Sequence, residues 1–158
     1  MKKIVFLALF VMAGLTAFSQ TAENDGWLLK IDEAYELSQK TGKPIMANFT
    51  GSDWCGWCRK LTSSVFSKQE FKTWAADNVI LLELDFPRRK KLSEELQAQN
   101  AQLQQAFQVR GYPTIWVFNL KKDPNTQQFQ IEALGKTGYR PTVAEFTTDV
   151  ERMIEQGK

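Results

Sequence analysis

The two cysteines of this chain stand in one short run, Trp54-Cys55-Gly56-Trp57-Cys58, and its 158 residues include no histidine. A Cys-x-x-Cys pair can hold a metal, attach a haem, form a passive disulfide or cycle between dithiol and disulfide. A structural zinc ion needs four ligands, mainly Cys and His, so this chain would have to recruit carboxylates or a second chain. A c-type haem needs His directly after the second Cys, where Arg59 stands. Redox cycling and a passive bridge remain.

The residues around the pair favour redox cycling. The run Pro44–Thr50 is short and largely apolar and predicts a buried strand, whereas apolar residues recur at helical spacing after Cys58. Cys55 is therefore expected where a strand turns into a helix, so that unpaired backbone N–H groups and the helix dipole stabilise its thiolate. Arg59 and Lys60 add positive charge nearby. A disulfide across two intervening residues closes too small a loop to constrain the unfolded chain much, which weighs against a purely structural bridge.

The first 19 residues predict a secretion signal. Lys2 and Lys3 precede an apolar stretch that is short for a membrane span, and Ala17-Phe18-Ser19 offers small residues for cleavage near Ser19. Residues 20–158 are then expected to form one domain in the periplasm or outside the cell, with no membrane span. An uncleaved N-terminal anchor is the alternative. Without the two leader lysines the 20 basic residues fall to 18, against 18 acidic ones, so a nucleic-acid partner is not expected.

Periodicity predicts one α/β domain without repeats. We expect helices over Trp27–Lys40, after Cys55, after a capping box at Ser67–Glu70, through Gln108, and after a second capping box at Thr142–Glu145. Strands are expected at Pro44–Thr50, at Val79–Asp85 as a central parallel strand, at Tyr112–Phe118, and at Gln128–Leu134, where Gly135 and Gly138 break the pattern. The basic run Arg88–Lys91 is interpreted as a solvated helix start, with a docking patch as the alternative.

These features together resemble the thioredoxin superfamily over nearly the whole chain after the leader. The stretch Asn48–Lys60 is similar to secreted bacterial thioredoxin-like proteins and, more distantly, to the C-terminal domain of the periplasmic electron-transfer disulfide reductase. A second motif, Gly111-Tyr-Pro-Thr114, follows at the expected distance. The resemblance implies a thioredoxin fold, with a central mixed four- to five-stranded sheet flanked by helices.

The resemblance also implies roles for individual residues. Cys55 matches the attacking cysteine, Cys58 the resolving cysteine and Pro113 a cis-proline that faces the disulfide. The Tyr112 backbone would pair with an extended partner peptide, although Tyr112 is equally interpreted as a partly exposed aromatic residue at a strand start. Trp54 is expected to tune the redox pair or contact the substrate.

Two positions depart from thioredoxin itself. Asn48 stands where a buried aspartate would help the resolving thiol lose its proton, and Gly56-Trp57 replaces Gly-Pro between the cysteines. An amide cannot act as a base. Because of the two departures, neither the rate nor the redox potential of thioredoxin can be carried over to this chain. Asp53 is either a substitute acid or, the interpretation we favour, a turn residue.

The function implied is thiol–disulfide exchange that reduces protein disulfides. The expected partners are disulfide-containing proteins or peptides and an upstream thiol or disulfide electron donor, with no metal or organic cofactor. Two alternatives stay open. One is an oxidase or isomerase using the same chemistry. The other is a non-catalytic module that binds an extended peptide on a face around Tyr112 and Trp57.

Overall fold

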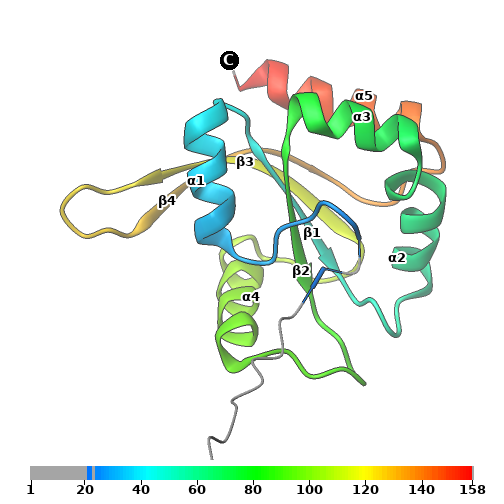
Figure 1. Cartoon of the computed structure of the whole chain (residues 1–158), viewed down its shortest axis with the longest axis horizontal. Helices are drawn as coiled ribbons and strands as arrows, with labels where there is room; N and C mark the ends of the chain where they lie inside the picture. The colour runs from blue at the N-terminus through cyan, green and yellow to red at the C-terminus, as the bar shows by residue number, and fades with distance from the viewer. Residues whose placement is uncertain (1–20, 23, 158) are drawn as a thin grey trace, which may run out of the picture.

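A four-stranded mixed sheet forms the centre of the computed structural model, which describes residues 21–22 and 24–157. The sheet order is β2-β1-β3-β4 (Figure 1). β1 runs parallel to β2 and antiparallel to β3, and β3 pairs antiparallel with β4. These strands are β1 (Ile45–Thr50), β2 (Ile80–Asp85), β3 (Thr114–Lys122) and β4 (Phe129–Thr137). The predicted mixed α/β sheet is confirmed.

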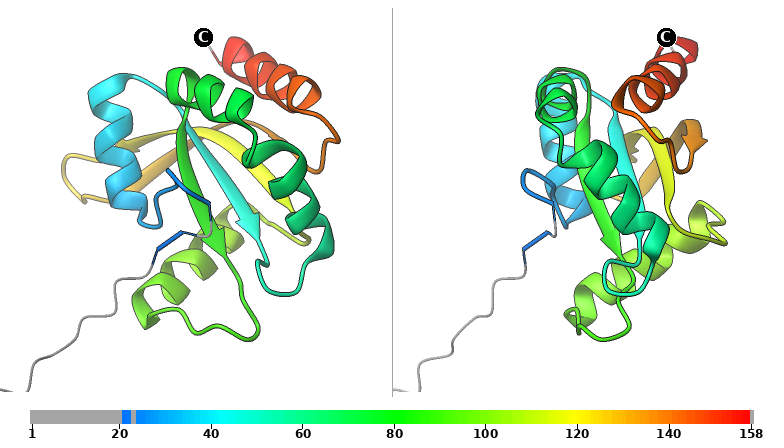
Figure 2. Two further views of the ribbon diagram at one scale, coloured as in Figure 1. Left: turned by 45° about the vertical axis from the view of Figure 1, so that its right-hand side comes forward. Right: turned by 90° about the vertical axis from the view of Figure 1, so that its right-hand side faces the viewer.

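Helices cover both faces of this sheet (Figure 2). One core cluster combines α1 and α4 with one face, and a second combines α2, η1, α3 and α5 with the other. The π-helical turn η1 continues directly from α2. The bounds are α1 (Ile31–Thr41), α2 (Gly56–Leu61), η1 (Thr62–Phe66), α3 (Gln69–Asn78), α4 (Glu94–Ala106) and α5 (Val143–Gln156).

All six residues of β1 are buried, and their alternation decides which side chains face α2. Ile45, Ala47 and Phe49 pack in the cluster of α1 and α4, whereas Met46 packs in the cluster that contains α2. Because side chains alternate along a strand, Asn48 shares the α2 side with Met46. By the same alternation Glu83 of β2 lies on that side. The face under α2 therefore carries buried polar groups near the carboxyl ends of both strands.

β2 is an edge strand of the sheet, which corrects its prediction as a central one. Residues 27–29 cover its outer edge, since the Leu28 N–H donates to the Leu81 carbonyl at 2.9 Å and the Glu83 N–H donates to the Leu28 carbonyl at 2.8 Å. The predicted helix start at Trp27 is wrong for the same reason, and α1 begins at Ile31. An edge covered in this way stays buried, so its sequence is as apolar as that of a central strand.

At one of the two predicted capping boxes, the predicted residue caps its helix. The Thr142 hydroxyl accepts from the Glu145 N–H at 3.3 Å and caps α5. At the other, α3 begins one residue later than predicted: Lys68 occupies the N-cap, and the Ser67 hydroxyl donates instead to the Ser63 carbonyl. The Ser67 side chain, which would have capped α3, is therefore bonded within the turn that follows η1.

Gly135 lies inside β4, which continues to Thr137 instead of ending at Leu134. A Cβ on Gly135 would come 2.5 Å from Met153 Cγ, so this glycine allows α5 to approach the strand closely. The basic run 88–91 precedes α4 as a loop and is not its first turn, because Ser93 caps that helix. α4 also ends at Ala106, two residues before the predicted Gln108. The predicted leader, residues 1–19, lies outside the described residues.

Candidate active site

The two cysteines form a disulfide at the start of α2, as their spacing predicts. Cys55 is the N-cap residue, and its sulfur accepts a hydrogen bond from the Cys58 N–H at 3.2 Å. The side chains are well covered, because Cys55 is 6% exposed and Cys58 is 3% exposed. Gly56 and Trp57, between them, are exposed. A backbone donor aimed at the Cys55 sulfur stabilises negative charge there once the disulfide is reduced.

A tight loop brings the chain from β1 to Cys55. The Cys55 N–H donates to the Gly51 carbonyl at 2.8 Å, and the Trp54 ring folds back over Gly51. A Cβ on Gly51 would lie 2.5 Å from that ring, so only glycine fits there. The Trp54 Nε1–H donates to the Phe86 carbonyl at 2.8 Å, which ties this loop to the segment after β2.

Pro113 lies at the same end of the sheet as the disulfide, and its bond to Tyr112 is cis. Thr114 pairs with Phe49 near the end of β1, so Pro113 extends toward the loop that carries the cysteines. Tyr112 is partly buried and packs edge-on against Trp54 at 5.7 Å between ring centroids. Its hydroxyl accepts from the Gln104 Nε2–H, and burial, aided by the charge of Asp85, raises the Tyr112 pKa above its usual value.

Lys60 of α2 lies over two aromatic rings, one of which, Trp57, stands between the cysteines. Trp57 is 57% exposed and packs against Tyr139 with ring centroids 5.0 Å apart. The Lys60 ammonium lies 5.0 Å from the Trp57 centroid and 5.5 Å from that of Tyr139. Tyr139 comes from the loop between β4 and α5, and the sequence carried no local signal that it would reach the site.

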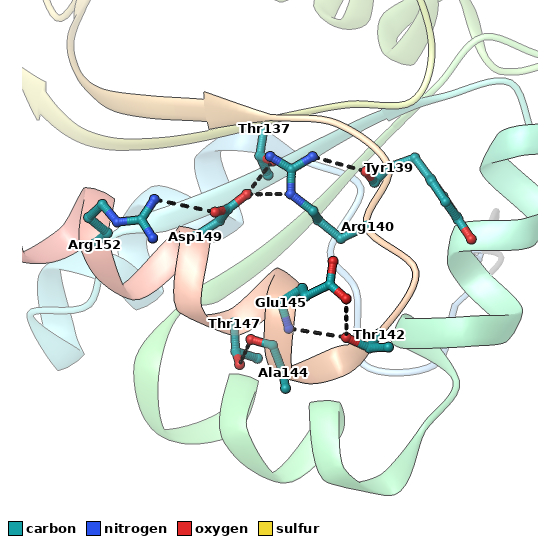
Figure 3. Close-up of polar contacts among 9 residues, drawn as sticks. All are labelled: Thr137, Tyr139, Arg140, Thr142, Ala144, Glu145, Thr147, Asp149 and Arg152. Carbon is teal, nitrogen blue, oxygen red and sulfur yellow. Dashed lines mark hydrogen bonds and ion pairs between the residues drawn. The ribbon is translucent and has the colours of Figure 1, made fainter.

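Asp149 of α5 holds the loop that carries Tyr139 (Figure 3). Its carboxylate accepts from the Thr137 hydroxyl at 2.9 Å and from the Arg140 Nε–H at 2.6 Å. A second Arg140 nitrogen donates to the Tyr139 carbonyl at 3.1 Å. Arg152 lies 3.5 Å from the other carboxylate oxygen. Asp149 thus binds Thr137 and Arg140, one on each side of Tyr139 in the chain, and this network positions Tyr139.

Asp53 joins the loop before Cys55, residues 51–54 (the redox loop), to the basic run 88–91. Its carboxylate accepts from the backbone N–H groups of Arg88, Arg89 and Lys90 at 3.0, 2.6 and 3.1 Å. These bonds, that of Arg88 first, lower the Asp53 pKa to about 2. The Arg88 guanidinium lies 3.9 Å from the Trp54 ring centroid. A carboxylate with that pKa is a poor base, so Asp53 is a turn residue, as favoured, and it anchors a second loop.

Asn48 is 2% exposed and occupies the side of β1 that faces α2. Its register partner on β2 is Glu83, also 2% exposed, whose carboxylate accepts from Asn24 Nδ2 at 2.9 Å. A pocket of about 260 Å³ is lined by both Asn24 and Cys58. The buried carboxylate on this face therefore comes from the neighbouring strand. A charged residue inside an apolar strand was the signal that could have singled out Glu83.

Metal and membrane features were also searched in the described part of the chain. No group of three or more His, Cys, Asp or Glu side chains there could hold a metal ion. None of the helices described combines the length and hydrophobicity of a membrane span.

Comparison with curated proteins found two relatives from Chlamydia pneumoniae. The chain is 39% identical over 83 residues to the disulfide bond reductase DsbH, a match that covers 52% of this chain and 50% of the relative. It is 25% identical over 118 residues to the thioredoxin-related protein DsbJ, covering 72% of this chain and 34% of that protein. The chain thus matches half or less of the length of these relatives.

Solved structures and a family model agree with these matches. A structure described as DsbH oxidoreductase superposes with a TM-score of 0.70 at 28% identity, covering 90% of this chain and 96% of that one. A thioredoxin from Thermus thermophilus shares the fold, with a TM-score of 0.56 at 20% identity over 80% of this chain and 85% of that one. The family model for a thioredoxin-like domain matches residues 31–131, which include both cysteines and the cis-proline. The protein therefore belongs to the thioredoxin-like family and has its fold.

Proposed function

We propose that this protein is a thiol–disulfide oxidoreductase of the cell envelope that reduces disulfides in other proteins or peptides. The observation that carries the proposal is the Cys55–Cys58 disulfide at the start of α2, with the cis Tyr112–Pro113 bond at the same end of the sheet. Reduction as the direction is supported by a relative whose name is disulfide bond reductase. The envelope location rests on the leader predicted for residues 1–19.

The reaction begins with the reduced protein. The Cys55 thiolate attacks one sulfur of the partner disulfide, forming a mixed disulfide and releasing the partner's other sulfur as a thiolate. The Cys58 sulfur, once deprotonated, attacks the Cys55 sulfur and releases the second partner thiolate. Two electrons have then passed to the partner, and Cys55 and Cys58 are left as a disulfide. An upstream thiol donor restores the dithiol.

The proton of the Cys58 thiol needs an acceptor, and Asn48 cannot serve. Glu83 is the acceptor in this proposal. Its carboxylate lies on the face under α2 opposite Asn48, and the Asn24 side chain that contacts it lines the same pocket as Cys58. The Glu83 carboxylate would accept the proton as Cys58 attacks the mixed disulfide.

Substrate contacts are assigned to the groups that surround the disulfide. The Tyr112 backbone, next to Pro113, would pair with an extended segment of the partner. The exposed Trp57, backed by Tyr139, offers an apolar surface beside the sulfur atoms. Trp54 is held by the Phe86 carbonyl and by Arg88, so its part is to keep the redox loop in place.

The test combines turnover with a reduction potential. The protein should catalyse reduction of a disulfide peptide by dithiothreitol, and Cys55→Ser should abolish that catalysis. Its potential in a glutathione buffer should lie at or below roughly −200 mV, in the range of thioredoxins and glutaredoxins. A potential near roughly −120 mV would indicate an oxidase instead. Absence of turnover with peptide binding retained would indicate a non-catalytic module.

A further inference from the structure

The basic loop, residues 86–91, is fastened to the redox loop by contacts from two consecutive residues. Asp53 binds three of its backbone N–H groups, and Trp54 binds the Phe86 carbonyl and stacks under Arg88. Asp53 and Trp54 immediately precede Cys55 in the chain. The basic loop follows the carboxyl end of β2, and the loop before α2 follows the carboxyl end of the parallel strand β1, so both lie at the same end of the sheet (Figure 1). The position of these cations relative to the disulfide is therefore set.

Positive charge is concentrated on the two segments that border Cys55. Residues 53–60 and 86–91 carry six Lys or Arg and one acid, Asp53, for a net charge of +5 in a chain whose total is +2. All six basic residues are exposed. Arg59, Lys60, Arg88, Arg89 and Lys90 form no salt bridge with any residue that the structure describes.

Three of the acids near these segments are buried or paired. Asp85 is buried and accepts from the Ser52 N–H and hydroxyl at 2.9 and 2.6 Å. Glu83 is buried under α2. Glu95, in the first turn of α4, lies 3.6 Å from Lys30. Each of the two tryptophans next to Cys55 in the motif thus carries a cation over its ring, Lys60 over Trp57 and Arg88 over Trp54.

We infer that the partner protein presents an acidic segment next to its disulfide and that this segment docks on the basic loop. The inference rests on the proposed function and narrows its substrate class. A partner disulfide must approach the Cys55 sulfur beside these two segments, so the residues that flank it meet exposed positive charge. Complementary charge accelerates association and selects partners more than it adds final affinity. Aromatic side chains interleaved with the cations suit a polypeptide, which offers apolar and acidic side chains together.

The test compares peptides that share one disulfide and differ only in whether the flanking residues are acidic, neutral or basic. The acidic peptide should show a kcat/KM higher than that of the neutral one by about tenfold at low salt, and the advantage should shrink as salt screens the charges. In Arg89→Glu/Lys90→Glu the preference should vanish or reverse. Both residues hydrogen-bond Asp53 through their backbone N–H groups, and the exchange keeps these bonds while it removes the attraction of the Arg89 charge for Asp53.

A matched control carries the same change in net charge away from the site. Lys40→Glu/Lys68→Glu alters exposed residues at the end of α1 and before α3 and should keep the preference for the acidic peptide. Equal kcat/KM for all three peptides would overturn the inference, as would an equal loss of preference in the control variant. Binding of anionic lipid vesicles by the basic loop, without discrimination among peptides, would also overturn it.

Two further readouts separate this inference from the proposed function. A neutral small-molecule disulfide, dipyridyl disulfide, reports on the thiols alone, and its turnover should be the same in both charge-reversed variants. Binding of the acidic peptide to the oxidised protein, followed by tryptophan fluorescence, needs no turnover. If the small disulfide is not reduced but the acidic peptide binds selectively, the proposed function fails and the docking surface stands. If the small disulfide is reduced and no peptide is preferred, the docking surface fails alone.

Discussion

Replacing Asn48 with aspartate would place a second carboxylate opposite Glu83. The two positions are register partners on parallel strands, and each residue is 2% exposed. Adjacent strands lie about 4.8 Å apart, so the two charges would be separated by about 5 Å. At an effective dielectric constant of about 20, that separation gives a repulsion of about 3 kcal/mol. Such a repulsion raises the pKa of the introduced carboxyl by about 2 units.

The sign of the pH dependence follows from that shift. A carboxyl whose pKa is raised in the folded protein holds its proton there after the unfolded chain has lost it, so stability falls as pH rises. The fall should begin near the unfolded value of about 3.9 and be complete above about pH 6. We expect Asn48→Asp to lower the free energy of unfolding by about 1.5 kcal/mol at pH 5 and by about 3 kcal/mol at pH 8.

Urea unfolding of the oxidised protein, followed by tryptophan fluorescence, measures this cost without interference from free thiols. The control is the same substitution in the Glu83→Gln background, where the second charge is absent and the pH-dependent cost should largely disappear. A cost that is equal at both pH values, or that is unchanged in the Glu83→Gln background, would refute the reasoning. The two side chains would then not face each other beneath α2.

Four further outcomes are expected. Cys58→Ser should accumulate mixed disulfides with envelope proteins while Cys55→Ser does not, and equal trapping by both on a non-reducing gel would contradict their division of labour. Glu83→Gln should slow release of the mixed disulfide by about tenfold or more and alter its pH profile in stopped-flow fluorescence, with the first attack unchanged, whereas a purely structural role would leave that profile unmoved. Asp53→Asn should destabilise the protein near neutral pH. Because the Asp53 pKa is lowered to about 2, the difference should fade as pH drops from about 4 to about 2, and thermal melts that differ equally at all pH values would contradict the anchoring role. The envelope-fraction protein should start within a residue or two of Gln20, which its intact mass checks, and a mass that retains the leader would indicate an anchored protein.

Features that depend on neighbouring residues could be predicted before the structure was known. The Cys-x-x-Cys pair follows an apolar strand and opens a helix, and Thr142 caps α5 through an N–H three residues away. The resemblance in Gly111-Tyr-Pro-Thr114 led to the expectation of a cis-proline, which the structure contains. Local signals succeed because turn chemistry, capping and strand or helix periodicity depend on neighbours within a few residues.

Other features depended on contacts between distant segments. A strand sequence is equally apolar whether its outer side pairs with another strand or is covered by residues 27–29. The sequence therefore could not show that β2 is an edge strand. Gly135 looked like a strand breaker because nothing nearby in the sequence shows that α5 packs against it. In each case the deciding partner lies far along the chain, where periodicity carries no information.

The site itself shows the same division. Both cysteines could be identified from the sequence, and the resemblance added Pro113 and Tyr112, but Glu83, Arg88 and Tyr139 could not be assigned to the site. Glu83 meets Asn48 across 35 residues, Arg88 covers Trp54 across 34, and Tyr139 reaches Trp57 across 82. These pairs exist only because the strand order brings separate loops to one end of the sheet. The spacing of the thiols is therefore a local property of the sequence, whereas the carboxylate proposed as their proton acceptor and the cations near them depend on the tertiary fold.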